Sequence, residues 1–344
     1  MRIQQLLATL ASAAALLVST THVRANSTTA VQDFTTQMGS WNVITSNAFS
    51  TDSHVHGTVA VGGSATLSGN AEINSHGTSN AEALRVYGAL NLVGTNSKVL
   101  SGGATIVKNA STNANLALHS GQPNPNQGLI KNNATNATLT FNGNGGTPAL
   151  SSLSTGDNFF VSRDSVMQAA NTELLTAGTL APTNNNYGRL TFNATTAGVS
   201  VFNWNIDQIT NINEVGFSFA TDSFIVVNIL GNTPNSTWNA GFNVLGGSND
   251  LAAHLLWNIG VSTVNLTGSE ILGSILAPDS TINSYKQLNG SIYAGSLNQH
   301  GQEIHYTPPS VNVPEEPSIL VLAFAAMAIG AAVWVRCSSR QTAK

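Results

Sequence analysis

The sequence has a single cysteine and few charged residues, and both shortages restrict what the protein can be. Cys337 has no partner for a disulfide bond, so a small scaffold held by disulfides is excluded. Charged residues make up 8% of the 344 positions, against roughly 25% in an ordinary soluble protein. The 12 lysines and arginines are too few and too scattered to cover a phosphate backbone, so nucleic acid is not an expected partner.

Neutral polar residues take the place of charge. The chain contains 40 asparagines and 31 glycines. Hydrophobic residues still make up 42% of the sequence, which is enough to bury a core. These proportions predict a folded, β-rich protein whose solubility comes from amides and hydroxyls.

The N-terminal segment, from Met1 to Ala25, has the layout of a secretory signal peptide. A basic start is followed by a short apolar run, Leu6–Val18, and then by small residues two apart, Val23 and Ala25. The apolar run is too short to span a membrane as an anchor. We expect cleavage after Ala25 and export of the remainder.

The other end of the chain predicts a membrane anchor. After a linker (311–318), an uncharged apolar run (319–335) is long enough to cross a bilayer as a helix. A basic tail (336–344) follows it, with the cations Arg336, Arg340 and Lys344. Under the positive-inside rule this tail stays in the cytoplasm, which places residues 26–310 outside the cell.

The linker and the two segments after it resemble the PEP-CTERM sorting signal of certain bacteria. That signal consists of a Pro-Glu-Pro motif, a hydrophobic helix and a short Arg-rich end. Here the motif contains a second acid, in the order Pro314, Glu315, Glu316, Pro317. The resemblance implies recognition by an exosortase, a membrane-embedded processing enzyme.

The charge of the predicted exported domain restricts its partners. Residues 26–310 contain 14 acids and 7 bases, so the balance is 7 − 14 = −7. A weakly acidic surface repels phosphates and anionic lipids. We therefore expect a neutral partner, either an extracellular glycan or a matrix protein.

Short alternating phrases rich in β-branched residues and glycine recur along this domain. Three lie early, in Gly57–Leu67, Leu84–Leu92 and Val99–Val107, and two lie late, in Gly273–Ile282 and Gly290–Leu297. Such phrases predict strands joined by tight turns. The interval between the starts of the two late phrases is close to one turn of a β-helix. The predicted fold is all-β, a β-solenoid with one packed α-helix and a C-terminal transmembrane helix.

The one helix expected inside the domain covers residues 164–176. Asp164 or Ser165 is the predicted N-cap and Gly178 the predicted stop. Four apolar residues are predicted to form its buried face: Val166, Ala169, Ala170 and Leu174. The Asn- and Gly-rich stretch before it (109–150) is expected to leave the regular solenoid.

Residues 26–310 resemble the choice-of-anchor A domain, a family of bacterial surface modules whose members end in interchangeable anchors. The late block carries most of the likeness, in Leu256–Asn258, Gly273–Pro278 and Leu288–Ala294. The family commonly has an acid before its first glycine-containing strand, where this sequence has His54-Val55-His56. The resemblance implies a β-structured module displayed at the cell surface.

Two groups of polar residues are candidate sites for chemistry. Asp52, His54 and His56 alternate along one strand and so could share a face, with His76 further on, but no fixed-spacing metal motif is present. Asp279, and Glu303 beside His305, offer acids without a nucleophile motif or a paired-carboxylate motif. We expect no catalytic residues, no metal and no cofactor.

The sequence thus predicts a structural or adhesive protein of the envelope or biofilm matrix. Ice binding is one alternative, but it needs a regular threonine array, and no Thr-x-Thr ladder is visible in the sequence. A polysaccharide-active enzyme using Asp279 or Glu303 is the other. Trp204, Trp238 and Trp257 are expected in the core, with a sugar-stacking platform as the alternative.

Overall fold

The computed structural model describes residues 27–77, 82–108, 111–120, 128–141, 148–151, 157–185, 187–245, 249–268 and 270–311. The predicted signal peptide, sorting motif, transmembrane helix (319–335) and basic tail lie outside these residues. Within the described ranges, no helix is both long and apolar enough to cross a membrane.

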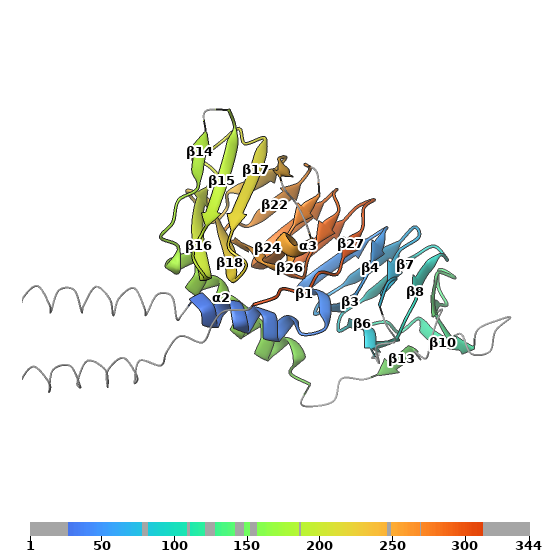
Figure 1. The fold of residues 1–344 in the computed structure, drawn as a ribbon. Helices are drawn as coiled ribbons and strands as arrows, with labels where there is room; N and C mark the ends of the chain where they lie inside the picture. Colours follow the sequence, from blue (N-terminus) through green and yellow to red (C-terminus); the bar gives the residue numbers. More distant parts are fainter. Residues whose placement is uncertain are drawn as a thin grey trace, which may run out of the picture.

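The domain is a stack of parallel β-strands with few helices (Figure 1), as the repeated phrases predict. Most turns of the chain contribute strand segments to three faces. Ile275 pairs with Ile292, so the two late phrases lie one above the other, one turn apart, as their interval in the sequence predicts.

The first face is covered by helices. Its strands, in spatial order, are β13 (Pro148–Ser151), β9 (Gly103–Val107), β6 (Glu82–Val86), β3 (Thr58–Val61), β1 (Trp41–Thr51), β26 (Ile292–Gln299), β24 (Ser274–Ser284), β21 (Leu255–Ile259), β18 (Ser223–Leu230) and β16 (Gly198–Asn205). The central strands of this face, such as β21 and β18, are buried on both sides, so β18 is a nearly continuous apolar run instead of an alternating one.

The second face belongs to the same 14-stranded sheet. The long strands β1, β24 and β26 continue into it past a register shift, and they are joined by β19 (Thr237–Ala240), β22 (Thr263–Leu266), β4 (Ala65–Ser68) and β7 (Leu90–Val93). Here buried and solvent-facing residues alternate, which indicates a sheet covered on one side only.

The third face is a separate sheet of short strands. In order these are β10 (Leu116–Ser120), β11 (Gly128–Asn132), β12 (Thr138–Phe141), β8 (Ser97–Val99), β5 (Glu72–Ile73), β2 (His54–Val55), β27 (Ile304–His305), β25 (Leu288–Asn289) and β23 (Ile271–Leu272). The predicted departure from the solenoid is the antiparallel excursion β10–β11–β12. A further, small sheet lies at one end, with β14 (Thr183–Asn185), β15 (Arg189–Ala194), β17 (Glu214–Phe219) and β20 (Asn243–Leu245).

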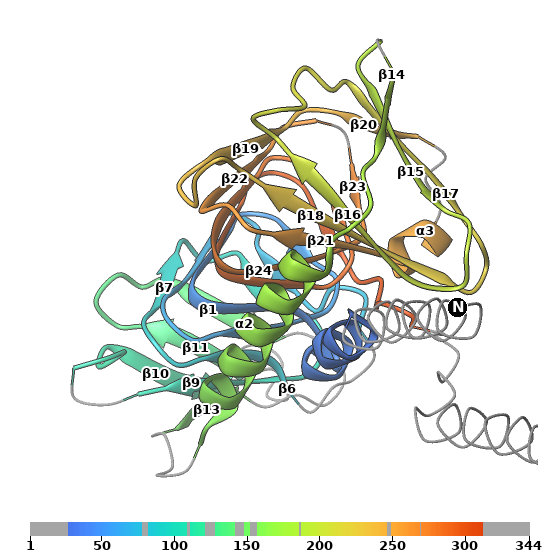
Figure 2. The ribbon, with the colours of Figure 1, turned by 90° about the vertical axis from the view of Figure 1, so that its left-hand side faces the viewer.

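The chain does not wind from one end of the stack to the other. It starts in the middle with β1, builds turns outward to β13, crosses to the opposite end, and then builds turns back from β16 to β26. The crossing includes α2 (Phe159–Ala177), which runs along the first face (Figure 2). The first and last turns therefore meet at a seam, where β1 pairs with β26 and β2 pairs with β27.

The helix prediction is right in kind but wrong in detail. α2 begins before the predicted start, with Asn158 as its N-cap, and ends at the predicted Gly178. Its buried face is Met167, Ala170, Asn171, Leu174 and Ala177, whereas Ala169 is exposed. Apolar and polar residues alternate irregularly around this helix, and Val161 is exposed, so the sequence does not define one apolar stripe.

Two further helices were not predicted. A helix over residues 27–38 packs beside α2, and α3 (Asn249–Ala253) is a short turn before β21. Phe34 and Met38 from the first of these join Met167 and Leu174 of α2 in a second core, outside the solenoid. The main core fills the inside of the solenoid.

Candidate functional site

The second face has two columns of uncharged, mostly polar side chains, which we name the Thr/Asn face. Each column takes one residue from each successive strand. The first column is Thr237, Thr263, Thr281, Ser296 and Ala48; the second is Asn239, Asn265, Asn283, Asn298, Ser50, Thr66 and Asn91.

Hydrogen bonds between neighbouring strands fix the second column. Asn265 Nδ2 donates to Asn239 Oδ1, Asn283 Nδ2 to Asn265 Oδ1, and Asn298 Nδ2 to Asn283 Oδ1, each at 2.9 Å. Ser50 Oγ then donates to Asn298 Oδ1 at 2.9 Å, across the seam. Each amide therefore has a set orientation, and the ladder forms a regular surface.

The residues between the columns point inward. Trp238, Val264 and Ile282 share a register between the two columns and are buried in the main core. Neighbouring strands are about 4.8 Å apart, so hydroxyls and amides repeat along the face at that interval. Neither column contains an ionisable side chain, which makes the face suited to a neutral, hydrogen-bonding surface.

The sequence shows no repeated Thr-x-Thr motif, but strand pairing aligns threonines that lie far apart in the chain. Thr237, Thr263 and Thr281 stand in register on three adjacent strands. The first two are farther apart along the chain than the last two, because the loops between turns differ in length. No fixed period appears in the sequence, so only strand pairing brings these residues together.

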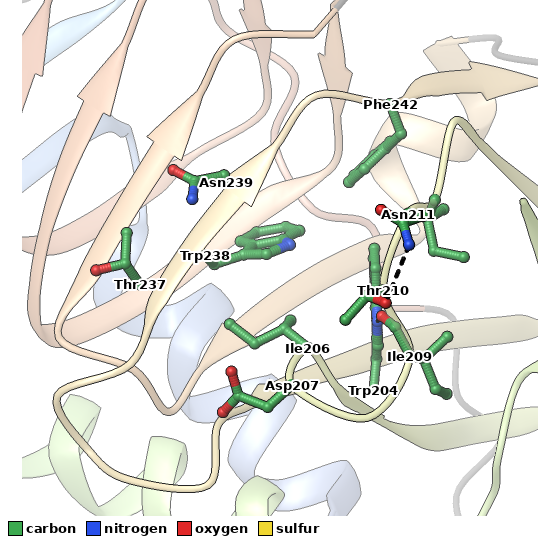
Figure 3. A pocket seen from close by; sticks show the side chains of 11 residues that line it. Trp204, Ile206, Asp207, Ile209, Thr210, Asn211, Thr237, Trp238, Asn239 and Phe242 are labelled. Atoms are coloured by element: carbon green, nitrogen blue, oxygen red, sulfur yellow. Dashed lines mark hydrogen bonds between the residues drawn. The ribbon is translucent and has the colours of Figure 1, made fainter.

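A cavity of about 260 Å³ opens at the end of this face (Figure 3). Thr237 and Asn239, the last members of the two columns, line it together with Asp207, and Trp204 and Trp238 form its apolar wall. Both tryptophans are only 3% exposed, and Trp257 is fully buried. All three are core residues, as the sequence analysis expects, and they leave no open aromatic platform.

One exposed aromatic pair flanks the face. Tyr285, two residues beyond Asn283, is 51% exposed, and its ring stacks on His300 with centroids 5.1 Å apart. His300 is likewise two residues beyond Asn298. A stacked, solvent-facing ring beside polar columns is a suitable contact for the apolar side of a sugar.

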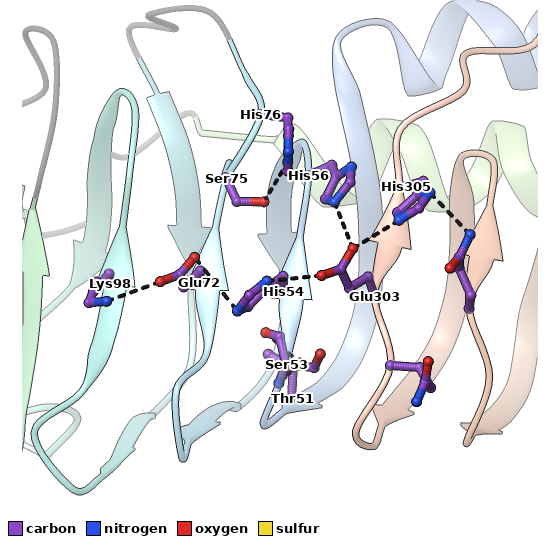
Figure 4. A network of polar contacts seen from close by, with 12 residues as sticks. Thr51, Ser53, His54, His56, Glu72, Ser75, His76, Lys98, Glu303 and His305 are labelled. Atoms are coloured by element: carbon purple, nitrogen blue, oxygen red, sulfur yellow. Dashed lines mark hydrogen bonds and ion pairs between the residues drawn. The ribbon is translucent and has the colours of Figure 1, made fainter.

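The third face carries a cluster at the seam, the His/Glu cluster, formed by His54, His56, His76, Glu303 and His305 (Figure 4). Glu303 is at its centre, because its Oε2 lies 3.1 Å from His56 Nε2 and 3.0 Å from His305 Nε2, and its Oε1 lies 3.1 Å from His54 Nδ1. The imidazole of His56 lies between two others, with ring centroids 3.9 Å from His76 and 4.1 Å from His305.

The surroundings shift the pKa of two members. Burial lowers the pKa of His56, and the nearby His305 and His76 lower it further, which outweighs its hydrogen bond to Glu303. The hydrogen bond from His305 lowers the pKa of Glu303, and the bond from His56 adds to it. Near neutral pH, the imidazole of His56 is therefore neutral and the carboxylate of Glu303 is ionised.

The structure places the other candidate residues from the sequence in different surroundings. Asp52 does not join His54 and His56; its Oδ1 accepts a bond from the Gly301 backbone at 2.7 Å. Asp279 lies within β24 on the other sheet, exposed and 3.4 Å from Gln168. Glu303 and His305 do belong to the cluster, although only the strand pairing of β2 with β27 could reveal that.

Comparison with solved structures finds similarities to ice-binding proteins. An ice-binding protein from an Arctic yeast is 13% identical, over 69% of this chain and 94% of that one, with a TM-score of 0.31. One from the Antarctic ascomycete Antarctomyces psychrotrophicus is 13% identical (67% and 96%, TM-score 0.32), and a domain from Shewanella frigidimarina is 12% identical (79% and 96%, TM-score 0.30). At these scores the likenesses say nothing of what this chain binds.

A search of curated protein sequences gives no match. The comparison with protein families, by contrast, matches residues 34–306 to the ice-binding-like adhesive domain. That range runs from the first helix to the last strand and covers well over half of the sequence. The chain therefore belongs to the ice-binding-like adhesive domain family.

Proposed function

We propose that this protein is an exported surface adhesin that works by display and without catalytic turnover. Its Thr/Asn face binds neutral, hydroxyl-rich polymers of the cell envelope or biofilm matrix. The observation that carries the proposal is the unbroken hydrogen-bonded ladder from Asn239 to Ser50.

The chemistry of the face supports a neutral ligand. Amides and hydroxyls that are held in place lose little conformational entropy on binding, so even modest contacts give a net gain. The exposed ring of Tyr285 adds a stacking position at the edge of the face. Many copies on one cell surface would convert weak individual contacts into avidity.

Ice binding is the second candidate, because one observation favours it. The column of Thr237, Thr263 and Thr281 supplies the regular hydroxyl array that ice recognition needs. The same face serves both candidates, so a change to the face affects either function, and the ligand that binds distinguishes them.

Replacing Thr281 with tyrosine is the test of the face. A ring in the middle of the first column projects above its neighbours and blocks contact with them, so we expect Thr281→Tyr to reduce binding roughly tenfold, as for a central interface residue. Binding is measured by co-sedimentation of the full-length protein with insoluble cellulose and chitin. Thr176→Tyr, on the exposed side of α2, is the matched control and should bind like the original protein.

Recrystallisation of ice in the same samples separates the two candidates. Suppose that the original protein inhibits ice recrystallisation but binds neither polymer, and that Thr281→Tyr abolishes the inhibition. Ice binding would then replace adhesion as the function of the face. If Thr281→Tyr leaves polymer binding unchanged, the Thr/Asn face is not the binding surface.

The route to the surface is part of the proposal. The resemblances to choice-of-anchor A modules and to PEP-CTERM signals support export, anchoring by residues 319–335, and processing by an exosortase-type enzyme. Mass mapping of protein released by the native host should then show a C-terminus within Pro314–Pro317. A chain that ends at Lys344 in both membrane and medium fractions would contradict sorting by this signal.

A further inference from the structure

The His/Glu cluster lies where the two halves of the solenoid meet. Val55 of β2 pairs with Ile304 of β27, so residues from opposite ends of the domain sequence are neighbours on adjacent strands. No covalent link joins the described strands there, and this seam depends on strand pairing and side-chain contacts alone. A group that binds both strands would hold the first turn to the last.

Three ligand atoms converge on one point at this seam. His56 Nε2, His305 Nε2 and a Glu303 carboxylate oxygen all lie within 4.8 Å of one another. In a tetrahedral zinc site with bonds of about 2.0–2.2 Å, the ligand atoms are about 3.3–3.5 Å apart. The two N···O distances of 3.0 and 3.1 Å are shorter than this by a few tenths of an ångström. The rings of His56 and His305 are stacked, so they must also rotate for both nitrogens to face the ion.

The donor set also has the right chemistry. Two imidazoles and a carboxylate suit zinc and its neighbours among the divalent first-row metals. The fourth position is open to water or to the imidazole of His76, whose ring centroid lies 3.9 Å from that of His56. Because calcium and magnesium prefer oxygen ligands, they fit this set poorly.

Neighbouring residues hold two of the three ligands in position. His305 Nδ1 lies 3.2 Å from Gln287 Nε2, and the second carboxylate oxygen of Glu303 lies 3.1 Å from His54 Nδ1. His54 in turn faces Glu72 at 3.6 Å, and Glu72 is paired with Lys98 at 3.0 Å. Such outer contacts orient metal-binding imidazoles and carboxylates in known sites.

We propose that His56, His305 and Glu303 bind a divalent transition-metal cation, with zinc as the fitting ion, and that the bound ion clamps β2 to β27. The site is on a different face from the Thr/Asn face, so it does not depend on the proposed adhesive function. Its role is to stabilise the closure of the solenoid.

The test is a titration of the EDTA-treated full-length protein with zinc chloride near neutral pH, in which calorimetry measures the heat of binding. We expect one equivalent to bind and the thermal midpoint of unfolding to rise with zinc concentration. His305→Gln keeps a hydrogen-bonding side chain but removes a direct ligand, so it should weaken binding by more than the roughly 10- to 100-fold cost of losing an outer contact. His119→Gln, an exposed histidine on β10, is the control and should bind like the original protein.

Two further measurements make the result decisive. Glu303→Gln preserves size and hydrogen bonding, so it tests the ligand set even if His305→Gln fails to fold. Cobalt(II) in place of zinc should give the intense visible absorbance of a tetrahedral site. The proposal is wrong if no stoichiometric binding occurs, or if the folded variants His305→Gln and Glu303→Gln bind zinc as tightly as His119→Gln.

Discussion

Replacing Asn228 with alanine is expected to lower the free energy of unfolding by about 3 kcal/mol, because it leaves buried polar groups without partners. Asn228 is fully buried between the first face and α2. Its Nδ2 donates to Leu174 O at 2.7 Å and to Asn203 Oδ1 at 2.9 Å, and its Oδ1 accepts from Asn258 Nδ2 at 2.9 Å. Urea unfolding of the two proteins measures the difference.

Asn283→Ala is the matched control for this prediction. Asn283 makes the same kind of contacts, giving one amide bond to Asn265 and receiving one from Asn298. It lies on the Thr/Asn face, where water can replace the lost partners, so we expect a loss of no more than about 1 kcal/mol. Equal losses in the two variants would show that the buried ladder does not fix α2 on the sheet.

These two asparagine ladders have the same local pattern but opposite environments. The buried ladder of Asn203, Asn228 and Asn258 secures the crossing helix, and Asn171 of α2 joins it through a 2.8 Å bond to Asn258 Oδ1. The outer ladder has no covering element among the described residues. The first ladder stabilises the fold because it lies under α2. The second lies on the solvent-facing side of the solenoid, where it is available for the proposed binding.

The sequence was sufficient to predict the solenoid because its turns repeat locally. The alternation of apolar and polar residues in Ala65–Ser68 and the short interval between Gly273 and Gly290 depend on neighbouring residues only. The excursion near residues 116–141 was predicted for the same reason, since its composition differs from that of the turns around it.

The candidate sites could not be predicted in the same way. The Thr/Asn face requires the register of Thr237, Thr263 and Thr281, and loops of unequal length conceal it. The His/Glu cluster requires the seam, which brings His56 beside His305 only after the chain has turned back. A sequence contains no direct signal for a topology that starts in the middle of its own stack.

Glycines at the corners allow one turn of the solenoid to pack closely against the next. Gly290 lies directly against Gly273 of the preceding turn, and a Cβ added to it would be 2.4 Å from Gly273 O and 2.8 Å from Ser274 N. Both atoms are backbone and cannot move without separating β24 from β26. We expect Gly290→Ala to cost about 3 kcal/mol or more of unfolding free energy, at the upper end of the cost of overpacking.

Gly216→Ala distinguishes this steric effect from a general intolerance of glycine replacement. A Cβ at Gly216, on β17, would have its nearest neighbour at 3.9 Å, and the backbone there is not left-handed. Alanine should therefore be neutral or slightly stabilising, by at most about 1 kcal/mol. If thermal and urea unfolding show Gly290→Ala to be as stable as Gly216→Ala, the turns are not packed as closely as this geometry requires. The glycines of the repeated phrases would then serve the tight turns alone and not the contact between one turn and the next.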